Sequence, residues 1–168
     1  VVIEGYPRLL KLAQLVAAMD AGMSAGQALQ LADALAELLD ELQREQVDPV
    51  TLDSLVPGEL ADKWQETLAF LKIIREHWPA MLRENAKVDP WQRRNEALSL
   101  LAASWRISPP PFPVIAAGST GSIPATAELL TVIAELPQGS VIMPGLDMQL
   151  GNTAWEALDE THPQYGLK

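Results

Sequence analysis

The fold is decided by residues 108–143, which read SPPPFPVIAAGSTGSIPATAELLTVIAELPQGSVIM. The three consecutive prolines near its start cannot continue a helix, so they predict an extended connector. The short apolar run at 114–117 then predicts a strand that breaks at a glycine-rich turn. Pro124 suits the first position of a helix that Pro137 ends, and 140–143 is typical of a second buried strand. This order predicts a βαβ unit, which implies a parallel sheet.

Upstream of the prolines, apolar residues recur three and four positions apart, which predicts amphipathic helices packed on one another. The first helix is expected to end near Gly22, and Ser24 is placed to cap a second helix that closes near Glu45. A third helix is predicted over 60–78, with a kink where its last tryptophan precedes a proline. Asp89-Pro90 opens a fourth helix. Its predicted inner face carries Trp91, Leu98, Leu101, Ala102 and Trp105.

The fold class predicted from these patterns is mostly α with a small α/β part. We expect a helical bundle over residues 1–108, followed by a partial α/β unit over residues 109–168. The absence of cysteine excludes a disulfide framework, thiolate zinc sites and iron–sulfur clusters within this chain. No apolar run approaches the roughly 18 residues of a membrane span, and we expect no signal peptide and a cytoplasmic setting without membrane contact. The first residue is Val rather than Met, and we expect a piece of a longer protein.

The chain has a net charge of -10, and its charged residues are distributed unevenly along the sequence. Residues 4–66 carry 12 acidic and 4 basic residues, whereas residues 72–106 carry 7 basic and 4 acidic residues. Because affinity for DNA comes largely from Lys and Arg, any nucleic-acid contact should be confined to this second stretch. A mixed, solvated surface is the simpler interpretation of the same charges. The candidates that would face DNA or a partner are Lys72, Arg75, Arg83, Lys87, Arg93, Arg94 and Arg106.

The turn after the first predicted strand is rich in glycine and hydroxyl groups, and turns of this kind before a helix bind anions. None of the five lysines follows a glycine, so the turn lacks the lysine of a nucleoside-triphosphate loop. A tight turn in which the last serine caps the helix is favoured, and an independent phosphate- or nucleotide-binding enzyme is the alternative. The turn consists of Gly118, Ser119, Thr120, Gly121 and Ser122.

The sequence predicts no catalytic residue, no metal site and no cofactor in this segment. His77 and His162 lack the spacing of metal ligands. Adjacent acids such as Asp40 and Glu41 do not face each other on a helix, so they are not a natural acid–base couple. The five tryptophans mostly fall on apolar helix faces, which favours core positions over platforms for stacked bases.

Residues 114–130 and 136–147 resemble a signature of the AddB subunit of the AddAB helicase-nuclease, of the alphaproteobacterial type. The likeness covers nearly the whole chain, and its C-terminal third is the specific part. The other matching segments are 155–159, 161–167, 32–43 and 64–79.

The resemblance implies a piece of a superfamily 1 helicase-like module that acts in repair of DNA double-strand breaks. Its helical half would correspond to an inserted 1B-type subdomain, and its βαβ half would return to a RecA-like 1A sheet. In an active helicase the first strand would end in an Asp-Glu pair that organises magnesium. Here it ends at Ala117 and Gly118, and Asp147 is the one acid after the second strand in the corresponding motif.

A degenerate nucleotide loop of this kind implies a non-catalytic segment without a cofactor. The family is described as keeping an inactivated helicase fold to grip DNA and its partner AddA. We therefore expect a scaffold that guides DNA within the parent complex. A different class of function, an acidic helical module that docks a basic partner, is the other alternative.

Overall fold

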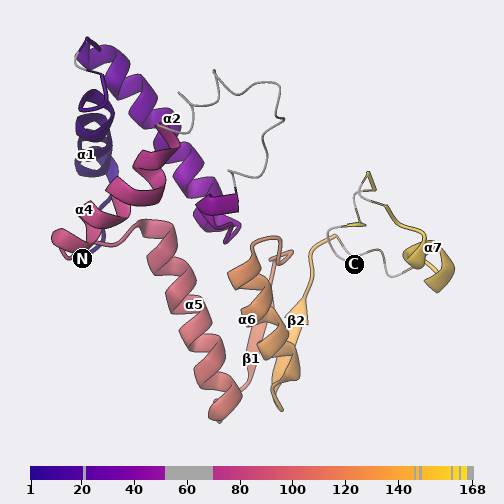
Figure 1. Cartoon of the computed structure of the whole chain (residues 1–168). Helices are drawn as coiled ribbons and strands as arrows, with labels where there is room; N and C mark the ends of the chain where they lie inside the picture. The colour runs from indigo at the N-terminus through magenta and orange to yellow at the C-terminus, as the bar shows by residue number, and fades with distance from the viewer. Residues whose placement is uncertain are drawn as a thin grey trace. The chain divides into compact units, whose positions relative to one another are not determined.

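In a computed structural model, residues 1–165 are described apart from 21, 52–69, 146, 148, 160 and 163. The chain forms two compact units, Val1–Arg94 and Asn95–Lys168. The first is helical, and the second contains a two-stranded parallel sheet (Figure 1). The predicted fold class, mostly α with a small α/β part, is confirmed. The compact units divide within a helix, and the division predicted after residue 108 stays a prediction.

The first unit is built on helices α1 (Gly5–Ala17) and α2 (Ala25–Arg44), which pack side by side. A π-helical turn, η3 (Ile73–His77), continues directly into α4 (Trp78–Glu84). One apolar core joins these elements because each turns its hydrophobic stripe inward. Its most deeply buried side chains are Leu12, Val16, Leu35, Ile73, Ile74 and Trp78.

Local capping fixes the start of α2 as the sequence predicts. The Ser24 hydroxyl accepts a hydrogen bond from the Gln27 backbone N–H at 3.3 Å, and the Gln27 side chain accepts one from the Ser24 N–H at 3.1 Å. This reciprocal capping box satisfies two backbone donors that the helix leaves unpaired. The first helix ends at Ala17, earlier than the expected stop near Gly22.

Residues 60–69 of the predicted third helix lie outside the described residues. From Phe70 onward the helix continues through Trp78 and Pro79 to Glu84. A π-helical turn lies just before Trp78-Pro79, and the kink expected at that step stays a prediction. Pro79 is the second residue of α4.

The second unit contains the predicted βαβ arrangement. Strands β1 (Val114–Ala117) and β2 (Gly139–Ile142) pair in parallel, with Val114 opposite Gly139, and α6 (Pro124–Glu135) packs against them. The prediction that the second strand is buried is wrong, because α6 covers one sheet face only. Ile115 and Ile142 on the other face are 66% and 57% exposed. A short helix, α7 (Asn152–Glu156), follows.

Ser122 does not cap α6. The N-cap residue is Ile123, whose carbonyl accepts hydrogen bonds from the backbone N–H groups of Thr126 and Ala127, both at 2.9 Å. Pro124 at the first helical position agrees with the prediction.

Helix α5 (Pro90–Ile107) begins after Asp89, as predicted, but its expected inner face is less buried than its pattern suggested. Trp91, Leu98 and Trp105 are half-buried, and Leu101 is exposed.

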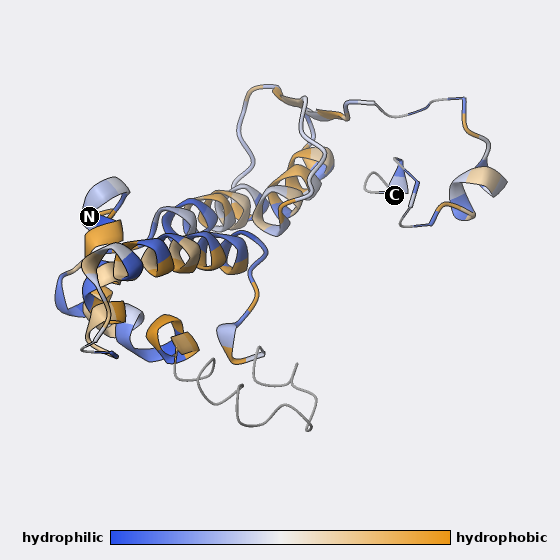
Figure 2. Ribbon diagram, turned by 90° about the horizontal axis from the view of Figure 1, so that it is seen from above, coloured by the Kyte–Doolittle hydropathy of each residue, from blue (hydrophilic) through white to orange (hydrophobic). Residues whose placement is uncertain are grey.

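Polar and apolar bands run along the helices in Figure 2. Within the part of the chain that the structure describes, no helix is both long and apolar enough to span a membrane.

Candidate nucleic-acid interface

Two of the predicted basic candidates, Lys72 and Arg106, each form an ion pair with a nearby glutamate. Lys72 lies 3.6 Å from Glu76, one turn along the helix. In the second unit, Arg106 lies 2.9 Å from Glu128. Hydrogen bonds from Arg106 and then from Ser99 hold the pKa of the Glu128 carboxyl below its usual value. Arg106 is therefore engaged within its own unit.

The remaining candidates lie in the first unit. Arg75 is half-buried in the π-helical turn. Arg83, Lys87 and Arg93 form no ion pair with any residue that the structure describes. Among the described residues, no carboxylate therefore pairs with their positive charge. Arg94 lies on the second turn of α5, next to Arg93.

Trp91, at the start of α5, carries two guanidinium groups at its ring. The Arg94 guanidinium lies 5.1 Å from the ring centroid and that of Arg44 lies 6.0 Å from it, both within the range of cation–π attraction. We call Trp91, Arg44 and Arg94 the Trp91 platform. Arg44 also forms ion pairs with Glu41 at 2.7 Å and with Glu45 at 3.1 Å, so two carboxylates already accompany its charge. Hydrogen bonds to Glu45 and then to Glu41 raise the pKa of Arg44, so it stays cationic.

The Trp91 platform differs from the sequence-based set in two ways. Trp91 was expected on an inner helix face, whereas its ring is half-buried beside two arginines. Arg44 was not a candidate, because it lies in the acidic stretch before residue 66. The three-residue spacing of Trp91 and Arg94 on one helix is a signal that sequence reasoning could have used. No local signal links Arg44 to Trp91.

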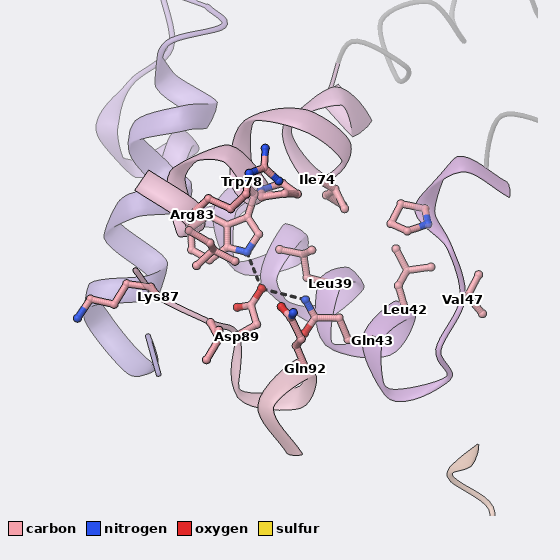
Figure 3. A pocket seen from close by; sticks show the side chains of 14 residues that line it. Leu39, Leu42, Gln43, Val47, Ile74, Trp78, Arg83, Lys87, Asp89 and Gln92 are labelled. Atoms are coloured by element: carbon pink, nitrogen blue, oxygen red, sulfur yellow. Dashed lines mark hydrogen bonds between the residues drawn. The ribbon is translucent and has the colours of Figure 1, made fainter. Parts of the chain in front are cut away.

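Asp89, immediately before α5, is fully buried and is the acceptor of three side-chain donors. Its Oδ1 accepts from Arg8 Nε at 2.8 Å. Its Oδ2 accepts from Trp78 Nε1 at 2.6 Å and from Gln43 Nε2 at 2.9 Å (Figure 3). The Arg8 Nη2 also lies 2.8 Å from Asp40 Oδ1, in an ion pair without hydrogen-bond geometry. We call Asp89, Arg8, Gln43 and Trp78 the Asp89 cluster. The sequence predicts for Asp89 only that it precedes a helix.

A cavity of about 420 Å³ adjoins the Asp89 cluster. Arg83, Lys87 and Gln92 line it together with Asp89, and its other walls are mostly apolar, including Leu39 and Ile74. The Lys87 side chain extends outward, away from Asp89 (Figure 3). The fold thus brings two of the predicted basic candidates, Arg83 and Lys87, to one cavity.

A second hollow, of about 350 Å³, lies between α1 and α2 and is acidic. Asp33 and Glu37, one turn apart on α2, line it together with exposed Tyr6 and with the buried Arg8 that pairs with Asp40. Neither carboxylate forms an ion pair within the described residues. Like charges one turn apart repel, so this groove favours a cationic neighbour.

The turn from Gly118 to Ser122 adopts left-handed backbone geometry at Gly118 (φ 82°) and at Gly121 (φ 69°), and the Ser119 hydroxyl accepts from the Gly121 N–H. Asp147, the acid after β2, accepts a hydrogen bond from the Gln149 N–H at 2.9 Å and so closes its own local turn. Among the described residues, no group of three or more His, Cys, Asp or Glu side chains is arranged to hold a metal ion.

Comparisons of this chain with protein-family models, with curated proteins and with solved structures gave no match.

Proposed function

We propose that this chain is a non-catalytic, helicase-like segment of an AddB-type subunit in a cytoplasmic helicase-nuclease that repairs DNA double-strand breaks. In this proposal it acts as a scaffold that guides DNA and contacts an AddA-type partner, and it requires no cofactor. The observation that carries the proposal is the Trp91 platform, with Arg93 beside it on α5.

The chemistry of the Trp91 platform supports DNA contact. Proteins that hold single strands combine cationic side chains along the backbone with aromatic or guanidinium surfaces on which bases stack. Trp91 and Arg94 offer such surfaces, and Arg93, Arg83 and Lys87 supply charge without an ion partner among the described residues. This local basic character contrasts with the net charge of -10 over the whole chain.

The residues at the strand ends support a non-catalytic role. Where the resemblance implies an Asp-Glu pair after the first strand, this chain has Ala117 and Gly118. After β2 the chain has Asp147, whose carboxylate is used in a local turn. The degenerate nucleotide loop therefore consists of Gly118 to Ser122 with Asp147.

A fluorescence-anisotropy titration with labelled single-stranded DNA at low salt tests DNA contact. Replacing Arg83, Lys87, Arg93 and Arg94 together by glutamine should weaken binding and lower the salt slope by about 0.7 for each lost phosphate contact. A control variant neutralises Lys11 on α1, which is not among the candidates, and should leave the affinity unchanged. Equal affinities of the quadruple variant and the unchanged chain would refute the proposal.

Calorimetry with ATP and magnesium tests the alternative, an independent phosphate- or nucleotide-binding enzyme. The proposal expects no heat of binding at micromolar concentrations, because the Gly118 turn lacks a lysine and Asp147 is occupied locally. Tight binding that is lost when Gly121 is replaced by valine would favour the enzyme instead.

The acidic groove between α1 and α2 favours one further candidate function, an interaction module for a basic partner. Asp33 and Glu37 there lack ion partners among the described residues, and Tyr6 exposes its ring beside them. This candidate is compatible with AddA contact. Salt-sensitive pull-down of an AddA-type subunit by the unchanged chain, lost in the Asp33→Asn/Glu37→Gln variant, would support it. Capture that persists in the variant would count against this groove.

A further inference from the structure

Two adjacent residues at the end of α2 reach two nearby residues at the start of α5. Gln43 donates to the Asp89 carboxylate at 2.9 Å, and the Arg44 guanidinium lies 6.0 Å from the Trp91 ring centroid. We infer that Asp89 is a positioning residue for the Trp91 platform, because it holds the start of α5 against α2 so that Arg44 reaches Trp91. This inference rests on the proposed function and names what sets the geometry of its DNA contact.

Asp89 is suited to this role because its side chain is completely buried and joins three helices. Arg8 comes from α1, Gln43 from α2 and Trp78 from α4, and all three donate to the one carboxylate. Figure 3 shows the bonds from Gln43 and Trp78. Hydrogen bonds to an ionised acceptor are shorter and stronger than neutral ones. Both carboxylate oxygens are engaged, so the side chain has one favourable orientation.

Backbone hydrogen bonds on both sides of Asp89 connect its fixed side chain to the start of α5. The Asp89 carbonyl accepts from the Arg93 N–H at 3.0 Å, in the first turn of α5. On the other side, Val88 pairs with the N-terminal segment, since it donates to the Val1 carbonyl and accepts from the Ile3 N–H. The residue that accepts from three helices therefore also begins the helix that carries Trp91 and Arg94.

The two cation–π contacts of the Trp91 platform depend on Asp89 to different degrees. Arg94 and Trp91 lie three residues apart on α5, so their contact persists wherever α5 is helical. Arg44 approaches from α2, so its contact depends on how the two helices are held together. Loss of the Asp89 carboxylate should therefore break the Arg44–Trp91 contact and leave the Arg94–Trp91 contact in place. A uniform loss of stability would weaken both contacts.

The test uses the full chain with Asp89→Asn, which places an amide where three donors converge. Aromatic ring-current shifts of the Arg44 and Arg94 side-chain protons are measured by NMR well below the unfolding temperature, with Trp91→Leu as the reference without a ring. We expect the Arg44 shift to be lost and the Arg94 shift to be kept. Affinity for oligothymidine should weaken about fivefold, which corresponds to one cation–π or guanidinium contact.

A second variant keeps the test decisive if Asp89→Asn does not fold. Gln43→Leu removes the α2 donor and leaves Asp89 with Arg8 and Trp78. Loss of the Arg44 shift in this variant, with weaker DNA binding, supports the inference. Retention of the Arg44 shift in either folded variant overturns it, as does unchanged DNA affinity after the shift is lost. If the unchanged chain does not bind oligothymidine, the proposed function fails instead.

Discussion

Removing the Arg8 guanidinium should destabilise the first unit strongly, because it leaves the buried Asp89 carboxylate without its cation. The side chains of Arg8 and Asp89 are 8% and 0% exposed and lie 2.8 Å apart. Breaking a buried ion pair by removing one partner costs about 3–5 kcal/mol. In Arg8→Met the Asp89 carboxylate keeps its Trp78 and Gln43 donors, so we expect a loss near the lower end, about 3 kcal/mol.

Urea unfolding followed by circular dichroism measures this loss. Lys72→Met is the matched control in the same unit, since Lys72 and Glu76 form an ion pair whose side chains are 54% and 56% exposed. Exposed pairs contribute little, so the control should lose less than about 0.5 kcal/mol. The double variant Arg8→Met/Asp89→Asn should lose about 2 kcal/mol less than the sum of the single losses, because both remove one interaction. An Arg8→Met loss below about 1 kcal/mol would refute the reasoning.

Three other expectations concern the backbone and one exposed carboxylate. Gly139→Ala should destabilise the second unit by roughly 3 kcal/mol in urea unfolding, because the new Cβ would lie 1.7 Å from the Ile133 carbonyl oxygen. Ala86→Gly should stabilise the first unit by about 1 kcal/mol, since Ala86 holds a left-handed φ of 50° that glycine adopts without strain. In an NMR pH titration, Glu128 should titrate below its usual value of 4.5, and Arg106→Gln should raise its pKa. Because the folded-state pKa of Glu128 is lowered, its contribution to stability is present above the unfolded-state pKa and is lost as the pH falls through the folded-state pKa.

For each of these three expectations, one result would contradict the physical reason given. Gly151→Ala is the control for the strand glycine, since nothing lies within 4 Å of a Cβ there, and equal losses in the two variants would remove the steric explanation. A destabilised Ala86→Gly chain would mean that the loss of a methyl group outweighs the relief of backbone strain. A Glu128 pKa that does not move in Arg106→Gln would show that the guanidinium does not set it.

The βαβ unit and the start of α2 could be predicted because their signals are local. Prolines end and begin helices through their own geometry, and Ser24 meets its capping partner three residues away. The failure at Ser122 has a local cause as well. The carbonyl of Ile123 already accepts the first backbone donors of α6, so a serine one residue earlier is not in the capping position.

The Asp89 cluster and the Trp91 platform could not be predicted, because tertiary packing assembles them. The donors to Asp89 lie 81, 46 and 11 positions away along the chain. An aspartate before a proline is an ordinary helix start, and nothing near it indicates that its side chain is buried. Arg44 lies in an acidic stretch of the sequence, which does not indicate a contact with α5. In the structure its neighbour Gln43 bonds to Asp89, and Arg44 lies at the Trp91 ring.

The most direct test of DNA contact through the Trp91 platform compares two tryptophans of α5. Both Trp91 and Trp105 are half-buried, and two arginine guanidinium groups lie at the ring of Trp91. Affinity for a labelled single-stranded oligonucleotide should fall about tenfold in Trp91→Leu, as expected for the loss of one stacked base, and should stay unchanged in Trp105→Leu. Equal affinities of Trp91→Leu and the unchanged chain would contradict the account.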